Sequence, residues 1–250
     1  MSDESWLEGA ISVTAALTAV SRPIHNIYIQ KGKSNTSIRH VRTAAKHADV
    51  PVQTVDNAFI DKKAGGRTHG GVLAQVGNRH FQTMAQLIEG KSSPFIVMLD
   101  GVEDPFNFGQ AVRAFYAAGA DGLILRPRNW MSAASVVARA SAGASELMPT
   151  AVSETAEEAA TFYRQHNLTI ACTSDKAAVS IYNTDLTIPL FLLVGGEKRG
   201  ITRSFMDQAD MRLQIPYARP FPYSLGTAVS ASVLAFELMR QKNHKQEVTT

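Results

Sequence analysis

Five short, nearly continuous apolar runs in the second part of the chain constrain the fold more than any other feature. They are PFIVMLD, DGLILR, LTIACTS, PLFLLVGG and MRLQIPY, between residues 94 and 217. Most of the segments between them have helical spacing. Strands that are apolar throughout are buried on both faces, which is typical of a mostly parallel sheet with helices on each side. Ligands of such sheets bind where the strands end, and this chain has glycine-rich and charged turns there.

The preceding part of the chain predicts a smaller α/β domain. HNIYIQ alternates like a strand, SIRHVRTAAKHADV has helical spacing, and VPVQTV reads as another strand. A loop with four glycines then leads into a further strand, VLAQVG. We expect residues 81–93 to form a helix followed by a polar link. The sequence therefore predicts two domains, at residues 1–85 and 93–250.

The small domain carries most of the concentrated positive charge. The whole chain has a net charge of only +3, yet residues 31–79 hold twelve Lys, Arg and His residues against three Asp residues. Such a skew suits contact with phosphates, although a solvated helix face with basic loops explains it equally well. The glycines at 65, 66, 70 and 71 can cradle a nucleic-acid backbone or simply form a flexible turn.

Several functions are disfavoured by what the sequence lacks. No apolar run approaches the ~20 residues of a membrane-spanning helix, and the N-terminus has no secretory pattern, so we expect a cytoplasmic protein. The single cysteine, Cys172, has no partner for an internal disulfide, and no Cys or His cluster predicts a metal site. The usual dinucleotide, P-loop, HExxH and GxSxG patterns are also absent.

The first segment with chemical promise is DPFNFGQAVRAFYAAGADGLIL. A strand ends at Asp100, and Asn107, Gly109 and Arg113 open the helix that follows. We expect Asn107 to cap this helix. Arg113 falls about one and a half turns later, from where it can reach back to a phosphate or ribose at the strand ends. The alternative is purely structural: Asn107 caps the helix, Gly109 allows close packing, and Arg113 is a cation on the surface.

The second segment is PLFLLVGGEKRGI, in which a buried strand runs into Gly195, Gly196 and Glu197 and the turn closes with Gly200. Glycines let a flat ligand approach the backbone closely. We expect Glu197 to cap the following helix, or to hold a neighbouring basic side chain.

The third segment is LQIPYARPFPYSLGTAVSASVLAFELMR. A strand ends at Pro216, a proline-rich loop follows, and Ser224 resembles the cap of a helix rich in small residues. We expect this helix to bury Val229, Val233 and Phe236 along one side. Its small residues permit tight packing, either within the chain or across a dimer interface.

Together these segments resemble the SpoU/TrmH family of RNA 2′-O-methyltransferases, within the SPOUT superfamily. The resemblance runs from about residue 94 to 240 and includes NxGxxxR, SAGASELMP, GGExxG and IP followed by SL. EGAISVTAAL, RPIHNIYI, ADVPVQTV and THGGVLAQV resemble the substrate-binding domain of the ribosomal RNA subgroup. The resemblance implies a small N-terminal α/β RNA-binding domain and a C-terminal α/β trefoil-knot domain with a mostly parallel sheet.

The resemblance also implies a cofactor, a partner and site residues. S-adenosylmethionine is the expected cofactor, RNA the expected substrate, ribosomal RNA above all, and family members work as homodimers without a metal, with the active site near the subunit interface. The residues expected to bind the cofactor are Gly195, Gly196, Glu197, Gly200, Ile215, Pro216 and Leu225. The residues expected to contact RNA are Arg39, Arg42, Lys62, Lys63, Arg67 and His69.

The expected catalytic residues are Arg113, Asn107 and Glu197. Guanidinium groups lose their proton only above a pH of about 12, so we expect Arg113 to organise the phosphate beside the attacking hydroxyl rather than act as a base. Asn107 and Glu197 are expected to hold Arg113 and the motif loops in place.

The third motif departs from the family pattern. Where the family usually reads SLNVS, this chain reads SLGTA, so Gly226 replaces an Asn and Ala228 replaces a Ser. The loop ARPFPY is also about one residue longer than usual. Thr227 or Tyr223 can supply the missing polar group. The alternative is a non-catalytic RNA-binding or assembly protein that keeps the fold with a degenerate third motif.

Overall fold

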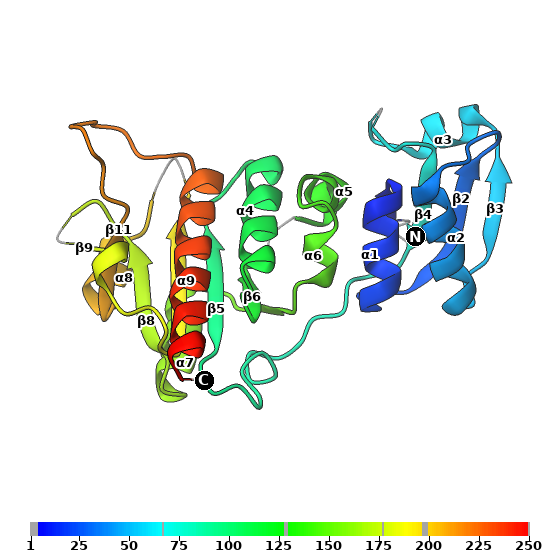
Figure 1. Ribbon diagram of the computed structural model, residues 1–250. Coiled ribbons are helices and arrows are strands. Elements are labelled where there is room, and N and C mark those ends of the chain that lie inside the picture. Colours follow the sequence, from blue (N-terminus) through cyan, green and yellow to red (C-terminus); the bar gives the residue numbers. More distant parts are fainter. Residues whose placement is uncertain (1–4, 67, 128–129, 177, 197–199, 250) are drawn as a thin grey trace. The chain divides into compact units, whose positions relative to one another are not determined.

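A computed structural model describes residues 5–66, 68–127, 130–176, 178–196 and 200–249 (Figure 1). The chain forms two compact units. One comprises Met1–His80 with Asn129–Leu147, and the other comprises Phe81–Arg128 with Met148–Thr250. Among the described residues, no helix combines the length and the apolar character needed to cross a membrane.

The first unit is built on a four-stranded sheet with the order β1-β4-β2-β3. β2 and β3 run parallel, and the other two pairings are antiparallel. The strands are β1 (Ser5–Glu8), β2 (Ile24–Gln30), β3 (Val52–Val55) and β4 (Val72–Val76). The helices are α1 (Ala10–Ala19), α2 (Thr36–His47), α3 (Asn57–Lys63), α5 (Trp130–Ala140) and α6 (Ala144–Leu147).

Helices α5 and α6 belong to this unit although they come from the middle of the chain. A Cβ atom on Gly143 would lie 2.7 Å from the Cβ of Ala15, so α1 packs closely on the turn between α5 and α6. Glu146 is buried, and Arg22 donates two hydrogen bonds to its carboxylate, at 3.0 and 2.8 Å. Ser21 donates a third, at 2.5 Å. Burial lowers the pKa of nearby Arg79 to about 10, against the opposing attraction of Glu146.

The second unit is a seven-stranded sheet with the order β7-β6-β5-β10-β8-β11-β9, and every pairing in it is parallel. Its strands are β5 (Phe95–Asp100), β6 (Gly122–Leu125), β7 (Thr150–Val152), β8 (Thr169–Thr173), β9 (Val179–Ser180), β10 (Leu190–Gly195) and β11 (Met211–Gln214). Five of them coincide with the five apolar runs. The prediction of a mixed α/β protein with a small N-terminal domain and a mostly parallel C-terminal sheet is therefore confirmed.

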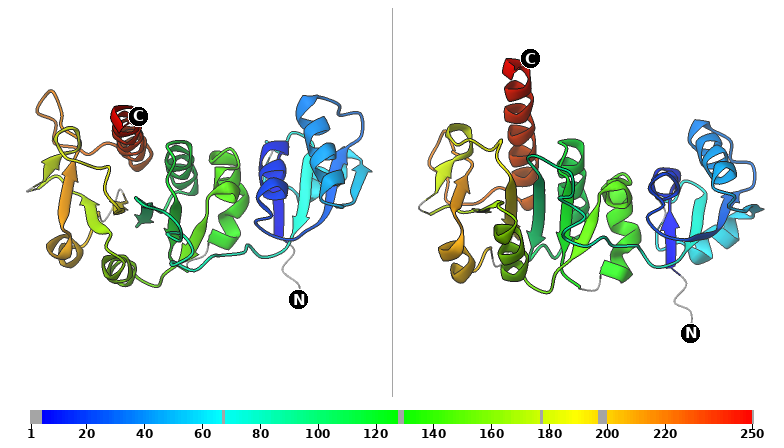
Figure 2. Two further views of the ribbon diagram at one scale, coloured as in Figure 1. Left: turned by 60° about the horizontal axis from the view of Figure 1, so that its bottom comes forward. Right: turned by 90° about the horizontal axis from the view of Figure 1, so that it is seen from below.

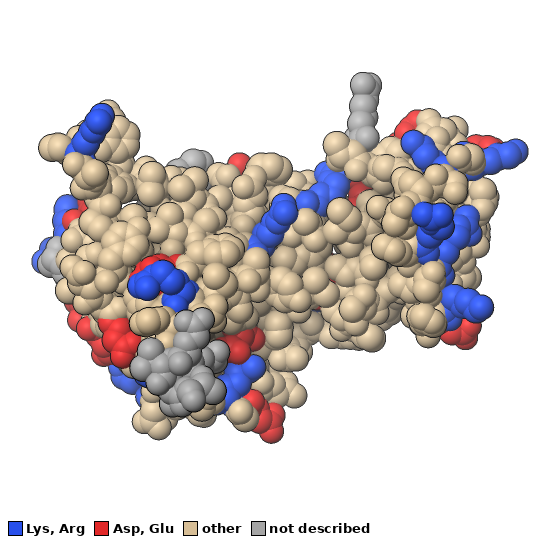
Figure 3. Space-filling view, in the orientation of Figure 1, with Lys and Arg blue, Asp and Glu red and all other residues tan. Residues whose placement is uncertain are grey.

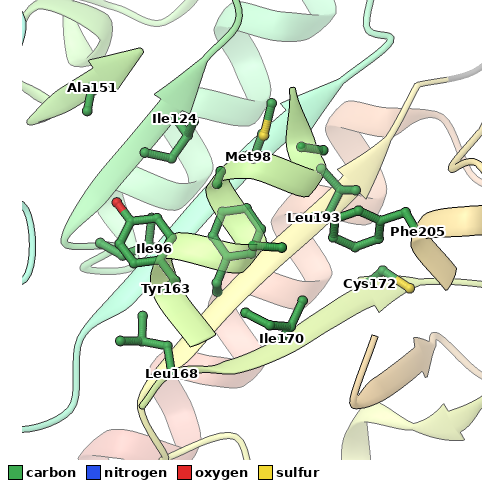
Figure 4. Packing of buried hydrophobic residues seen from close by; sticks show 14 of the residues in the cluster. Ile96, Met98, Ile124, Ala151, Tyr163, Leu168, Ile170, Cys172, Leu193 and Phe205 are labelled. Carbon is green, nitrogen blue, oxygen red and sulfur yellow. The ribbon is translucent and has the colours of Figure 1, made fainter. Parts of the chain in front are cut away.

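Helices cover both faces of this sheet, as Figure 2 shows. On one face lie α4 (Pro105–Ala117) and α9 (Thr227–Thr249), which pack side by side, and on the other lie α7 (Ala156–Gln165) and α8 (Arg203–Gln208). Alternate side chains of the central strands point toward the helices on opposite faces of the sheet. Ile96 and Met98 face Tyr163 of α7 (Figure 4), whereas Phe95 points the other way and lies 5.9 Å from the ring of Phe115 in α4.

Two predicted elements differ from the structure. Residues 81–93 form turns rather than a helix, because Thr83 and Gln86 bond to each other's backbone and side chain and Gly90 has a φ of +70°. Helix α9 begins at Thr227, three residues beyond the predicted cap Ser224, and its buried face carries Leu234 and Leu238. The prediction that Val229 and Phe236 are buried is wrong, since both are exposed. The threading of the chain end into a knot stays a prediction.

Candidate functional site

Four strands of the parallel sheet end along one edge and bring their following turns together. Gly195 at the end of β10 is in register with Asp100 of β5, and Leu193 with Cys172 of β8. Leu213 of β11 pairs with Thr173 of β8. Since the carboxyl ends of parallel strands are where ligands bind, this edge is the candidate ligand-binding region of the sheet.

A pocket of about 700 Å³ lies at this edge, a size suited to a cofactor. It is lined by the glycine turn, by the proline-rich loop with the start of α9, and by the end of β8. Gly195, Gly196, Gly200, Ile215, Pro216 and Leu225, six of the residues expected to bind a cofactor, all line it. Val194, Ile201, Met206, Leu213 and Leu234 add an apolar wall.

Glycine is required at position 196 because the ends of β10 and β5 meet there. Its amide donates a hydrogen bond to the carbonyl of Asp100 at 2.7 Å, and a Cβ atom here would lie 1.9 Å from the carbonyl oxygen of Gly101. Only glycine fits so close to a neighbouring backbone. Gly226 differs, because a Cβ atom there would meet nothing within 4 Å.

Two threonines hold the glycine turn from either side. The amide of Gly195 donates to Thr173 Oγ1 at 3.4 Å, and the buried Thr227 hydroxyl donates to the carbonyl of Gly195 at 3.5 Å. Thr173, Ser174 and Asp175 also line the pocket, and the sequence reasoning missed them. The signal for them was available, because they lie at the carboxyl end of a predicted buried strand and directly after it.

The loop after Pro216 closes one side of the pocket with aromatic rings. Tyr217, Phe221 and Tyr223 line the pocket, and all three rings are exposed. The amide of Leu225 donates a hydrogen bond to the hydroxyl of Tyr217 at 3.0 Å. This contact joins the two ends of the loop.

Two of the expected catalytic residues, Arg113 and Asn107, are not among the described residues that line this pocket. Arg113 lies on the exposed side of α4, and Asn107 is half-buried in the first turn of that helix. Asn107 is not the cap as predicted: Asp104 caps α4 and accepts a hydrogen bond from the amide of Phe106 at 2.8 Å. The Pro at position 105 explains the earlier start, because its fixed φ suits the first helical position.

Glu197 lies outside the described residues. Its expected roles, as a helix cap or as the partner of a basic side chain, therefore stay predictions. The cap that the structure describes for α8 is Thr202, which accepts a hydrogen bond from the amide of Phe205 at 3.2 Å.

The residues expected to contact RNA lie in the first unit. Arg39 and Arg42 are exposed on α2, and Lys62 and Lys63 end α3. Several Lys and Arg side chains gather on the visible surface of this unit (Figure 3). Lys63 Nζ lies 5.1 Å from the centroid of the Trp6 ring. Arg67 lies outside the described residues.

The ring of His69 makes contacts within the first unit. It is buried, its Nε2 lies 3.5 Å from Asp61 Oδ1, and its Nδ1 accepts a hydrogen bond from the amide of Gly71 at 3.1 Å. Both ring nitrogens therefore hold the glycine-rich loop.

Cys172 is not among the described residues that line the pocket. Cys172 is buried in β8, and burial raises the pKa of its thiol to about 11, which disfavours the reactive thiolate. Among the described residues, no three His, Cys, Asp or Glu side chains gather as metal ligands.

Each of the two parts of the chain matches a known protein family. Residues 94–236 match the SpoU rRNA Methylase family, and residues 6–82 match the RNA 2′-O ribose methyltransferase substrate binding domain. The chain is 29% identical over 241 residues to the 23S rRNA (guanosine-2′-O-)-methyltransferase RlmB of Haemophilus influenzae, covering 94% of this chain and 96% of that protein. It is 28% identical over 238 residues to RlmB of Pasteurella multocida, covering 94% and 97%.

Solved structures share the fold. The SpoU methyltransferase AviRb of Streptomyces viridochromogenes, in complex with AdoMet, superposes with a TM-score of 0.80 at 18% identity, over 96% of this chain and 91% of that one. The AdoMet-bound rRNA methyltransferase of Sinorhizobium meliloti gives 0.77 at 22% identity, over 95% and 87%.

Proposed function

This chain belongs to the SpoU rRNA methylase family, and we propose that it transfers a methyl group from S-adenosylmethionine to a ribose 2′-hydroxyl of ribosomal RNA. The observation that carries the proposal is the pocket in which the glycine turn and the proline-rich loop meet, inside the segment that matches the family. The match of the first unit to a substrate-binding domain supports RNA as the substrate. Membership of a methylase family does not favour the non-catalytic alternative.

The pocket residues fit S-adenosylmethionine. The apolar side chains of Ile201, Leu213 and Leu234 suit a flat adenine ring, and the polar groups of Ser174 and Asp175 suit ribose hydroxyls or an ammonium group. When bound, S-adenosylmethionine supplies a methyl group activated by a positively charged sulfur. We assign its binding to Gly195, Gly196, Glu197, Gly200, Ile215, Pro216 and Leu225.

Catalysis then depends on alignment of the ribose oxygen and on removal of its proton. An in-line displacement gains most from holding the two reacting atoms in line at short distance. We assign Arg113 to the phosphate beside the attacking hydroxyl, with Asn107 and Glu197 supporting it. Thr227, buried in the pocket wall, takes the polar role that Gly226 cannot fill.

The proposal includes a homodimer in the cytoplasm. Adjacent helices α4 and α9 present exposed apolar side chains, among them Phe106, Tyr116, Val229 and Phe236. Apolar side chains on neighbouring helices support an interface with a second copy. Arg113 lies on the exposed side of the same α4, from where it can serve an active site near that interface.

The test is transfer of labelled methyl groups from S-adenosylmethionine to unmodified ribosomal RNA transcribed in vitro. We expect label in RNA that withstands alkaline hydrolysis next to the modified nucleotide, since a 2′-O-methyl group blocks that cleavage. Absence of transfer to any ribosomal RNA, with the cofactor bound, would contradict the proposal.

Arg113→Ala tests the assigned role within that assay. We expect kcat to fall about a hundredfold or more, as when a group that stabilises developing charge is removed, with unchanged affinity for S-adenosylmethionine. Arg203→Ala is the matched control, because the Arg203 side chain is 92% exposed on α8 and does not line the pocket. Full activity of Arg113→Ala would show that the assignment is wrong.

A further inference from the structure

Three exposed aromatic rings follow one another along the proline-rich loop beside the pocket. Tyr217 is 41% exposed, Phe221 58% and Tyr223 70%. The loop projects from the sheet edge and is the orange segment at the upper left of Figure 1. Large apolar surface facing water is unfavourable, so three such rings in seven residues call for a binding explanation.

The rings are held in a set arrangement. The centroid of Phe221 lies 6.3 Å from that of Tyr217 and 5.4 Å from that of Tyr223. Prolines at 216, 220 and 222 fix φ at three positions of the loop, and the bond from the Leu225 amide to the Tyr217 hydroxyl closes it. A loop restrained in this way loses little conformational entropy when a ligand binds.

The position of the rings limits the ligands that they can contact. All three line the same pocket as Pro216 and Leu225, and all three are also exposed to solvent. Arg219, between them in sequence, is exposed, and Figure 3 shows a basic side chain at the outer end of this loop. A cation beside exposed aromatic faces is the usual composition of a site for an unstacked nucleotide.

We propose that Tyr217, Phe221 and Tyr223 form a subsite that stacks on the base of the nucleotide whose ribose is methylated, with Arg219 against its phosphate. This inference rests on the proposed function. The 2′-hydroxyl must enter the pocket for methyl transfer, and the base is attached to the neighbouring carbon of the same ribose. A base leaving its RNA stack therefore reaches the rim of the pocket, where the rings lie.

The first experiment compares Tyr223→Ala and Phe221→Ala with the ring-retaining Phe221→Tyr in steady-state methylation of ribosomal RNA transcribed in vitro. We expect the alanine variants to raise the KM for RNA about five- to a hundredfold, the range that loss of one stacked base gives, and Phe221→Tyr to keep most of the RNA affinity because it keeps the ring. Tyr182→Ala is the matched control, because Tyr182 is 50% exposed and lines no part of this pocket.

Calorimetry with S-adenosylmethionine distinguishes base stacking from a role in which the three rings only cover the bound cofactor. Unchanged affinity in Tyr223→Ala and Phe221→Ala supports base stacking. A loss of cofactor affinity equal to the loss in kcat/KM would overturn the proposal, and so would alanine variants with the RNA KM of wild type.

Ultraviolet crosslinking to the same RNA, read out by peptide mass spectrometry, tests the subsite without relying on turnover. A crosslink within residues 217–223 is expected, and its absence while other peptides crosslink would overturn the proposal. Failure of the proposed function looks different, since wild-type protein would then bind RNA without transferring label.

Discussion

Glycines in this chain serve distinct purposes that only their surroundings reveal. Gly196 lies against the backbone of Gly101, at a distance that admits no side chain, whereas Gly226 borders open space. In the sequence both stand in motif loops and look alike. The sequence predicted that these glycines let a flat ligand approach the backbone, which stays a prediction, but it gave no sign that Gly196 lies against another strand end.

Substitution of these two glycines gives opposite expectations. Gly196→Ala forces the ends of β5 and β10 apart, so we expect a loss of about 3 kcal/mol or more in the free energy of unfolding and weaker cofactor binding. Gly226→Ala should change stability by less than about 1 kcal/mol. Urea unfolding and calorimetry measure both, and a stable, cofactor-binding Gly196→Ala would refute the packing argument.

The buried thiol of Cys172 gives a pH-dependent expectation. Its folded pKa, about 11, is above the ordinary value of 9.0, so the folded state holds the thiol proton more tightly than the unfolded state. The resulting stabilisation is complete below about pH 9 and is lost as the pH rises toward 11. Urea unfolding at pH 8 and pH 10.5 should show a smaller loss for Cys172→Ala than for wild type, and equal losses would contradict the assignment.

At the scale of elements, the apolar runs predicted the central strands well because a strand buried on both faces has a distinctive composition. The buried side of helix α9 was harder to predict. Its buried side combines leucines with Ala231 and Ala235, while Val229 and Phe236 form an exposed apolar side, so periodicity offered two stripes and no means to choose. The pocket itself followed from the strand-end rule, but Arg113 cannot be placed by sequence, because spacing does not say which way a helix faces.

The exposed side of α9 leads to a prediction about assembly. We expect the wild-type chain to be a dimer in light scattering at micromolar concentration, and Phe236→Asp combined with Val229→Asp to give a monomer, because buried unpaired charges are costly. Val179→Asp is the control, since Val179 is similarly exposed on the edge strand β9. A monomeric wild type would rule out the proposed interface.

At the scale of the whole molecule, charge is distributed unevenly, and binding to RNA should depend on salt accordingly. Each phosphate contact contributes roughly 0.7 to 0.9 to the slope of log affinity against log salt. Arg39→Gln combined with Arg42→Gln should therefore reduce that slope by about 1.5. Arg203→Gln combined with Arg240→Gln removes equal charge from the other unit, and an equal effect of the two pairs would contradict a role for α2.

The return of residues 129–147 to the first unit affects the order of events during synthesis. The chain leaves this unit after residue 80 and comes back to it through α5 and α6. On the ribosome, β5, α4 and β6 are therefore made before the first unit can be completed, and the partners that Ser21 and Arg22 find in Glu146 arrive 125 and 124 residues later. Until that point the surface of α1 that packs on Gly143 is without this partner, so we expect the two units to mature in an interleaved order rather than one after the other.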